Sequence, residues 1–153
     1  MGIEDYIKSI AGSDVLLKKV KEVKKLGDAI CPDKIEDFFV TEYRKPDNER
    51  VYQSLFLFSK RYLLESKNIL SSETKIDIAF YFEYVDYFEI TSNGYDFRKA
   101  SENSTLELEG TIGSIVFDLK ASGKNCDKLW TLTKKYIKPN LYSEIAFEET
   151  VEE

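Results

Sequence analysis

The side chains that could do chemistry are one cysteine near a helix start, a pair of glutamates and several aromatic and basic residues. The 153-residue chain contains no histidine. This removes Ser-His-Asp and Cys-His catalysis, histidine-containing zinc sites and the commonest general base near neutral pH. Its two cysteines cannot complete a four-sulfur metal site by themselves. We therefore expect no enzyme activity, no catalytic residues, no metal site and no cofactor.

Cys126 and the Glu107–Glu109 pair have structural explanations. A helix N-terminus can lower the pKa of a thiol, but Cys126 falls on the apolar face of a predicted helix. A buried thiol is therefore expected there. Glu107 and Glu109 alternate with Leu106 and Leu108, which is the pattern of a strand with one solvated face.

Two groups of residues are candidates for ligand binding. Tyr81 and Tyr87 alternate with the phenylalanines of FYFEYVDYF (80–88) and lie beside acidic residues. They could form an exposed surface for a peptide, although ordinary surface tyrosines explain them as well. The second group consists of basic residues at two predicted turns, which could bind an anionic lipid or small ligand: Lys45, Arg50, Lys60 and Arg61.

The charge distribution argues against nucleic acid. The net charge is −6, whereas a duplex-binding domain presents a basic surface to the phosphates. Five lysines lie in 18–25, and five glutamates with no basic residue lie in 143–153. This uneven charge is explained if both segments are simply exposed to solvent. The alternative is that the acidic tail covers the lysines or binds a basic partner. Peripheral membrane contact is disfavoured, because the lysine segment lacks bulky aromatic anchors.

The chain reads as a cytoplasmic protein. Its longest apolar runs, such as 55–58, are far shorter than the roughly 20 residues that span a bilayer. The start of the chain, MGIEDYIKS, has acids where a secretory signal has bases. The cysteines are therefore expected to be reduced.

The periodicity predicts an α+β, mainly β fold. Helices are expected over 3–11 and from an N-cap at Ser13 to a C-terminal Gly27. From Phe38 the period is two. The long alternation of 75–90 is split near 83–86, because strands average about 5–6 residues. The expected strands occupy 38–45, 50–59, 61–68, the two halves of 75–90, 105–110 and 114–121. The chain is expected to consist of three units: an N-terminal helical extension (1–30), a sheet domain (31–140) and an acidic tail (141–153).

A last helix should begin at an Asn125 cap and stop at Pro139. Its apolar face carries the expected structural residues Leu129, Trp130 and Ile137. Trp130 is expected to be an important contact with the sheet, so that its replacement by alanine would cost about 3–5 kcal/mol.

This order of elements resembles bacterial pleckstrin-homology (PH-like) domains. LFLFSKRYLLE is similar to their early hairpin, and NCDKLWTLTKKYI is similar to their closing helix, with Trp130 where that family often has a tryptophan. The resemblance covers about residues 35–138. It implies a bent antiparallel barrel of about seven strands capped by a C-terminal helix, here preceded by N-terminal helices.

The resemblance implies little about a phosphoinositide ligand. Lys45 and Arg50 could occupy the binding loop of that family, but Tyr52 stands where a second basic residue belongs. Asp47 and Glu49 would repel a polyphosphate.

We therefore predict a non-enzymatic module that binds a protein or peptide at a sheet edge or beside the closing helix, with homo-oligomerisation as one form of this. Anionic ligand binding at the basic turns is one alternative. An NTF2-like α+β roll with an internal pocket is another, in which residues 1–30 would be essential. The PH-like interpretation treats those residues as dispensable.

Overall fold

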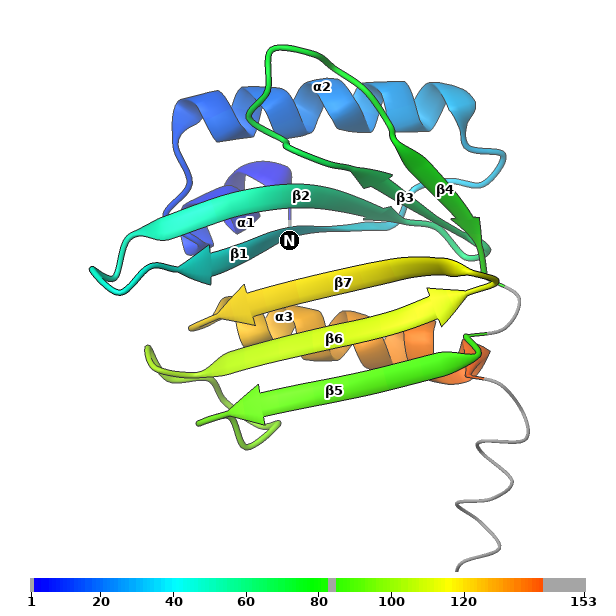
Figure 1. The fold of residues 1–153 in the computed structure, drawn as a ribbon. Coiled ribbons are helices and arrows are strands. Elements are labelled where there is room, and N and C mark those ends of the chain that lie inside the picture. Colours follow the sequence, from blue (N-terminus) through cyan, green and yellow to red (C-terminus); the bar gives the residue numbers. More distant parts are fainter. Residues whose placement is uncertain (1, 83–84, 142–153) are drawn as a thin grey trace, which may run out of the picture.

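A computed structural model describes residues 2–82 and 85–141 and shows an α+β, mainly β fold (Figure 1). Seven antiparallel strands are present, as predicted, but they form two separate sheets, and within the described residues these do not close into the expected barrel. The first sheet contains β1 (Asp37–Arg44), β2 (Arg50–Phe58), β3 (Tyr62–Ser66) and β4 (Ile78–Tyr81) in that order. The second contains β5 (Tyr87–Asn93), β6 (Thr105–Ile112) and β7 (Ile115–Ser122).

Two helices precede the first sheet and one follows the second. They are α1 (Ile3–Ser9), α2 (Asp14–Ile30) and α3 (Asn125–Leu132), and α3 continues as a π-helical turn (Thr133–Ile137) and a 3-10 turn (Lys138–Asn140). In Figure 1, α2 runs along the first sheet and α3 lies behind the second. No helix among the described residues combines the length and apolarity that crossing a bilayer requires.

The first sheet is covered on both faces. Leu55, Phe56, Leu57 and Phe58 are all buried, although successive side chains of a strand point to opposite faces. Phe58 packs on Tyr136 after α3, with ring centroids 5.0 Å apart, while α2 and α1 contribute to the same hydrophobic core. The N-terminal helices are therefore a layer of the domain, not an accessory to it.

Gly27 allows α2 to approach the sheet. The prediction that it ends the helix was wrong, because α2 continues to Ile30. A Cβ at Gly27 would lie 2.6 Å from Leu57 Cδ1 and 2.8 Å from Ile35 Cδ1. The glycine therefore serves close helix–sheet packing. The predicted N-cap is confirmed, since the Ser13 side chain accepts a hydrogen bond from the Leu16 amide.

Asn125 was expected to cap α3, and this was wrong too. The N-cap is Lys124, with no side-chain capping bond. The Tyr6 hydroxyl donates to Asn125 Oδ1 (2.8 Å) and accepts from the Val40 amide (2.9 Å), and Asn125 Nδ2 donates to the Val40 carbonyl (3.1 Å). This buried group joins α1, β1 and α3.

Trp130 is less central than expected. Leu129 and Ile137 are fully buried, whereas Trp130 is half-buried and packs edge-on against Phe97, with centroids 4.7 Å apart. Its substitution should therefore cost less than that of a fully buried aromatic residue. Cys126 is fully buried, and burial raises the pKa of its thiol to about 12.

Candidate functional site

The four basic residues proposed from the sequence do not form one site. Lys45 and Arg50 lie at the β1–β2 turn, whereas Lys60 and Arg61 follow the other end of β2. The nine residues of β2 separate these ends by about 25–30 Å. Arg61 forms two short bonds with Asp33, 2.6 and 3.0 Å long, and Lys45 pairs with Glu49 at 3.5 Å.

Tyr81 and Tyr87 are both exposed, but they lie on different sheets. The Tyr81 ring packs against Tyr62 on β3. The Tyr87 hydroxyl donates to Glu89 on the same strand. Only Tyr87 therefore belongs to an aromatic and acidic surface.

That surface is one face of the second sheet. The strand register opposes Glu89, Glu109 and Asp118 across β5, β6 and β7, and directly opposed residues project from the same face. The row on one side is Tyr87–Thr111–Val116 and the row on the other is Thr91–Glu107–Lys120. We call these nine residues the acidic face, because they carry four carboxylates and one amine.

The acidic face ends at an open sheet edge. β5 is the outer strand of its sheet, and among the described residues no strand pairs with its free side. Six of its seven residues are exposed. Its other face presents Ile90, which is exposed, and Phe88, which is partly buried. An exposed edge of this length is a template for pairing with another extended chain.

Three carboxylates of the acidic face crowd together beside a lysine. Oxygens of Glu107, Glu109 and Asp118 lie within 4.8 Å of one another, an oxygen set of the kind that binds hard cations. Lys120 Nζ lies 3.8 Å from Glu107 and 3.9 Å from Asp118. Because this amine already offsets part of the charge, the cluster is better described as an anionic surface than as a metal centre.

Asp118 should make stability pH-dependent. Burial, and then the neighbouring Glu107 carboxylate, raise its pKa from 3.8 to about 7. The folded state therefore holds this proton more tightly than the unfolded state does, and this group lowers stability as the pH rises from about 4 to about 7. We expect Asp118→Asn to raise the Tm at about pH 8 by on the order of 2 °C, and to leave it unchanged near pH 4.

Thermal unfolding followed by circular dichroism across this pH range measures the effect. Glu102→Gln, a charge-neutralising change on the β5–β6 loop, is the control. Equal Tm differences for Asp118→Asn at the two ends of the range would contradict the prediction.

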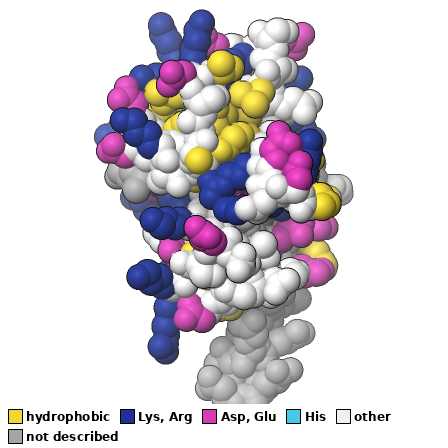
Figure 2. All heavy atoms as spheres, turned by 90° about the vertical axis from the view of Figure 1, so that its left-hand side faces the viewer, with side chains coloured by type: hydrophobic (Ala, Val, Ile, Leu, Met, Phe, Trp, Pro, Cys, Tyr) yellow, Lys and Arg dark blue, Asp and Glu magenta, His cyan; other side chains and the backbone are white. Residues whose placement is uncertain are grey.

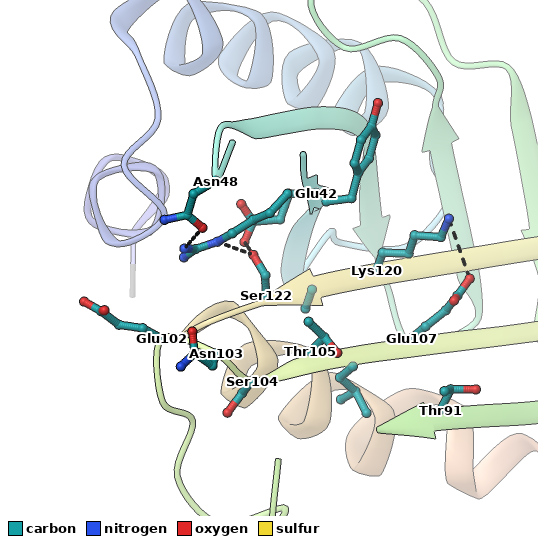
Figure 3. Close-up of a pocket in the computed structure, with 14 residues that line it drawn as sticks. Glu42, Asn48, Thr91, Glu102, Asn103, Ser104, Thr105, Glu107, Lys120 and Ser122 are labelled. Atoms are coloured by element: carbon teal, nitrogen blue, oxygen red, sulfur yellow. Dashed lines mark hydrogen bonds and ion pairs between the residues drawn. The ribbon is translucent and has the colours of Figure 1, made fainter. Parts of the chain in front are cut away.

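A pocket of about 360 Å³ lies between the β1–β2 hairpin and the second sheet (Figure 3). Glu42 is buried in its wall and accepts a hydrogen bond from Ser122 (3.2 Å). Arg44 donates from Nε to Ser122 (3.4 Å) and from Nη1 to Asn48 (3.0 Å). Arg50 Nε lies 3.6 Å from Glu42 Oε2. Burial raises the pKa of Glu42, and Arg50 opposes that effect.

Sequence reasoning missed three residues at this end of the molecule. Glu42 and Arg44 line the pocket of Figure 3, and Lys124 lines a second pocket that shares Arg44 with it. The sequence did contain one signal, because Arg44 and Arg50 flank a five-residue link that was predicted to be a turn. No local pattern indicated that β7 and the start of α3 would lie beside them.

Comparisons with protein-family models, with curated proteins and with solved structures gave no match. The acidic face, the edge of β5 and the pockets beside the β1–β2 hairpin are therefore the features from which a function can be inferred.

Proposed function

We propose that the chain is a non-enzymatic, PH-like binding module that takes an extended basic segment of a partner protein along the edge of β5. The observation that carries this proposal is the position of the acidic face next to an exposed, seven-residue edge strand. Recognition of this kind needs no catalytic group, because backbone pairing supplies affinity and side-chain contacts supply specificity.

The order of elements supports the PH-like part of the proposal. Four consecutive antiparallel strands are followed by three more and then by a helix that packs into the common core. The NTF2-like alternative is less well supported. It requires α1 and α2 to pack on the first sheet, which they do, but the face that they cover holds buried apolar side chains, Phe38, Leu55 and Leu57 among them, where a pocket would be expected.

The two faces of β5 define the partner's sequence pattern. Side chains of an added strand alternate between the faces of the sheet. Partner side chains that project from one face would meet the row of Glu89, Glu109 and Asp118. Partner side chains that project from the other face would meet Ile90 and Phe88. The matching partner is a segment in which lysine or arginine alternates with apolar residues.

The same charges disfavour pairing between two copies of the chain at this edge. Two β5 strands side by side would bring Glu89 and its row close to the same row of the second copy, and like charges at a sheet edge oppose association. We therefore place a different protein, not a second copy, at β5.

Charge reversal on the acidic face should abolish selectivity for a basic peptide. A synthetic peptide alternating lysine and valine should shift the β5 amide resonances of the full chain, and the same peptide with glutamate in place of lysine should not. Each exposed ion pair contributes about 0.2–1 kcal/mol, and reversal replaces attraction by repulsion. The double variant Glu89→Lys, Glu109→Lys should therefore bind at least about tenfold more weakly.

Glu73→Lys, on the β3–β4 loop away from the acidic face, is the matched control and should bind normally. Equal binding of both peptides to the native chain, or shifts confined to elements other than β5 and its neighbours, would refute the proposed site.

A further inference from the structure

We infer a second binding site, independent of the edge of β5, in which the turn end of the β1–β2 hairpin and the start of α3 bind a phosphate monoester group. The site is a pocket of about 470 Å³. We call it the arginine pocket and define it by Ser9, Arg44, Arg50, Ser101, Gly123 and Lys124.

Two guanidinium groups converge in this pocket. Arg44 and Arg50 are directly opposed in the hairpin, and the Nη2 atom of each lies 3.4 Å from the point where a Cβ of Gly123 would stand. The two Nη2 atoms are therefore no further apart than twice this distance. One oxyanion can accept hydrogen bonds from both at such a spacing.

The other nitrogens of both guanidiniums are already engaged. Arg44 uses Nε and Nη1 for Ser122 and Asn48, whereas Arg50 donates from Nη1 to the Ile10 carbonyl and faces Glu42 with Nε. Among the described residues neither Nη2 has a hydrogen-bond partner. The two donors are thus held in place while remaining free for a ligand, which lowers the entropy lost on binding.

Gly123 and α3 complete the site. Gly123 has φ +57°, a conformation that suits glycine, and its missing Cβ leaves the space in front of both Nη2 atoms empty. Lys124 follows and is exposed. Lys124 is also the N-cap residue of α3, so the positive end of the dipole of this helix lies at the wall of the pocket.

The local charge favours an anion in a chain whose net charge is −6. Three cationic side chains line the pocket, opposed by Glu102 at its rim and by the buried Glu42 behind it. Figure 2 shows basic side chains gathered near the middle of the end of the molecule that carries the β1–β2 turn, with acidic side chains beside them.

A phosphate monoester fits these donors better than a carboxylate does. It presents three acceptor oxygens and a charge between about −1.5 and −2 at neutral pH. Two arginines from neighbouring strands and one lysine from the β7–α3 junction can each meet a different oxygen. A planar carboxylate has only two oxygens to offer.

The test titrates the full chain with inorganic phosphate and with glycerol 3-phosphate, followed by amide chemical shifts and calorimetry. Shifts should centre on Gly123, Lys124 and the β1–β2 hairpin. Arg44→Gln should weaken binding at least about tenfold, because a charge-assisted hydrogen bond is lost. Lys45→Gln is the matched control: it makes the same charge change one residue away and should leave binding unchanged, since Lys45 does not line the pocket.

Lys124→Gln provides a variant that does not disturb the hairpin and should also weaken binding, whereas Glu102→Gln should strengthen it. Vesicles of phosphatidylcholine with and without phosphatidic acid distinguish the sources of the phosphate. Capture only by phosphatidic acid, released by glycerol 3-phosphate, supports a lipid headgroup, and binding of the soluble esters without capture supports a free metabolite. No binding in either assay, or equal weakening by Arg44→Gln and Lys45→Gln, overturns the inference.

Discussion

Removal of residues 1–30 is expected to leave a chain that does not fold. The segment contributes six fully or almost fully buried apolar side chains, each worth about 1.5–3 kcal/mol: Tyr6, Ile7, Ile10, Leu16, Val20 and Val23. Their sum is comparable to the whole stability of a typical domain, about 5–15 kcal/mol. The truncation would also uncover Leu57 and Leu64, which lie under Gly27 of α2. This reverses the expectation that a PH-like core would tolerate the deletion.

Far-UV circular dichroism and thermal unfolding of the truncated chain measure this directly. A matched pair within α2 tests the reason. Val20 is fully buried and Val15 is 62% exposed, so Val20→Ala should cost about 1–3 kcal/mol of unfolding free energy and Val15→Ala less than about 0.5 kcal/mol. Cooperative unfolding of the truncated chain near the Tm of the full chain would show that α1 and α2 are dispensable.

Tyr6→Phe should be the most damaging loss of a single oxygen atom in the described part of the chain. The hydroxyl lies in a fully buried position between the Asn125 side chain and the Val40 amide. Its removal leaves the Val40 amide donor and the Asn125 carbonyl acceptor without this partner in a buried site. Each such group costs about 1–3 kcal/mol, so we expect a loss of about 2–4 kcal/mol.

Tyr43→Phe is the matched control, because Tyr43 is 40% exposed and lines an open pocket. It should change stability by less than about 0.5 kcal/mol. Urea unfolding at equilibrium gives both values. Equal small effects of the two substitutions would mean that the junction of α1, β1 and α3 relaxes or admits water, and would remove the argument that Tyr6 holds these elements together.

The periodicity of the sequence was enough to locate most elements. Strands β1, β2 and β7 follow the predicted segments closely, and the long alternation of 75–90 divides into β4 and β5 as expected. These features depend on residues within one element or one turn, so neighbouring residues contain the necessary information.

Two residues were given the wrong role for a common reason. Gly27 and Asn125 are typical of helix ends, but the role of each depends on what the rest of the chain places beside the residue. Leu57 and Ile35 require a glycine at position 27. Tyr6 and Val40 bind the Asn125 side chain.

The sequence by itself determined the class of fold, the order of its strands and helices, and the absence of histidine-based chemistry. Only the tertiary structure decided that α2 is a layer of the core, that β5 borders an acidic face, and that Arg44, Arg50 and Lys124 share a pocket. Local periodicity records which side of an element is apolar, whereas contacts between distant segments depend on how whole faces pack together. A binding site made from such contacts leaves no regular spacing in the sequence.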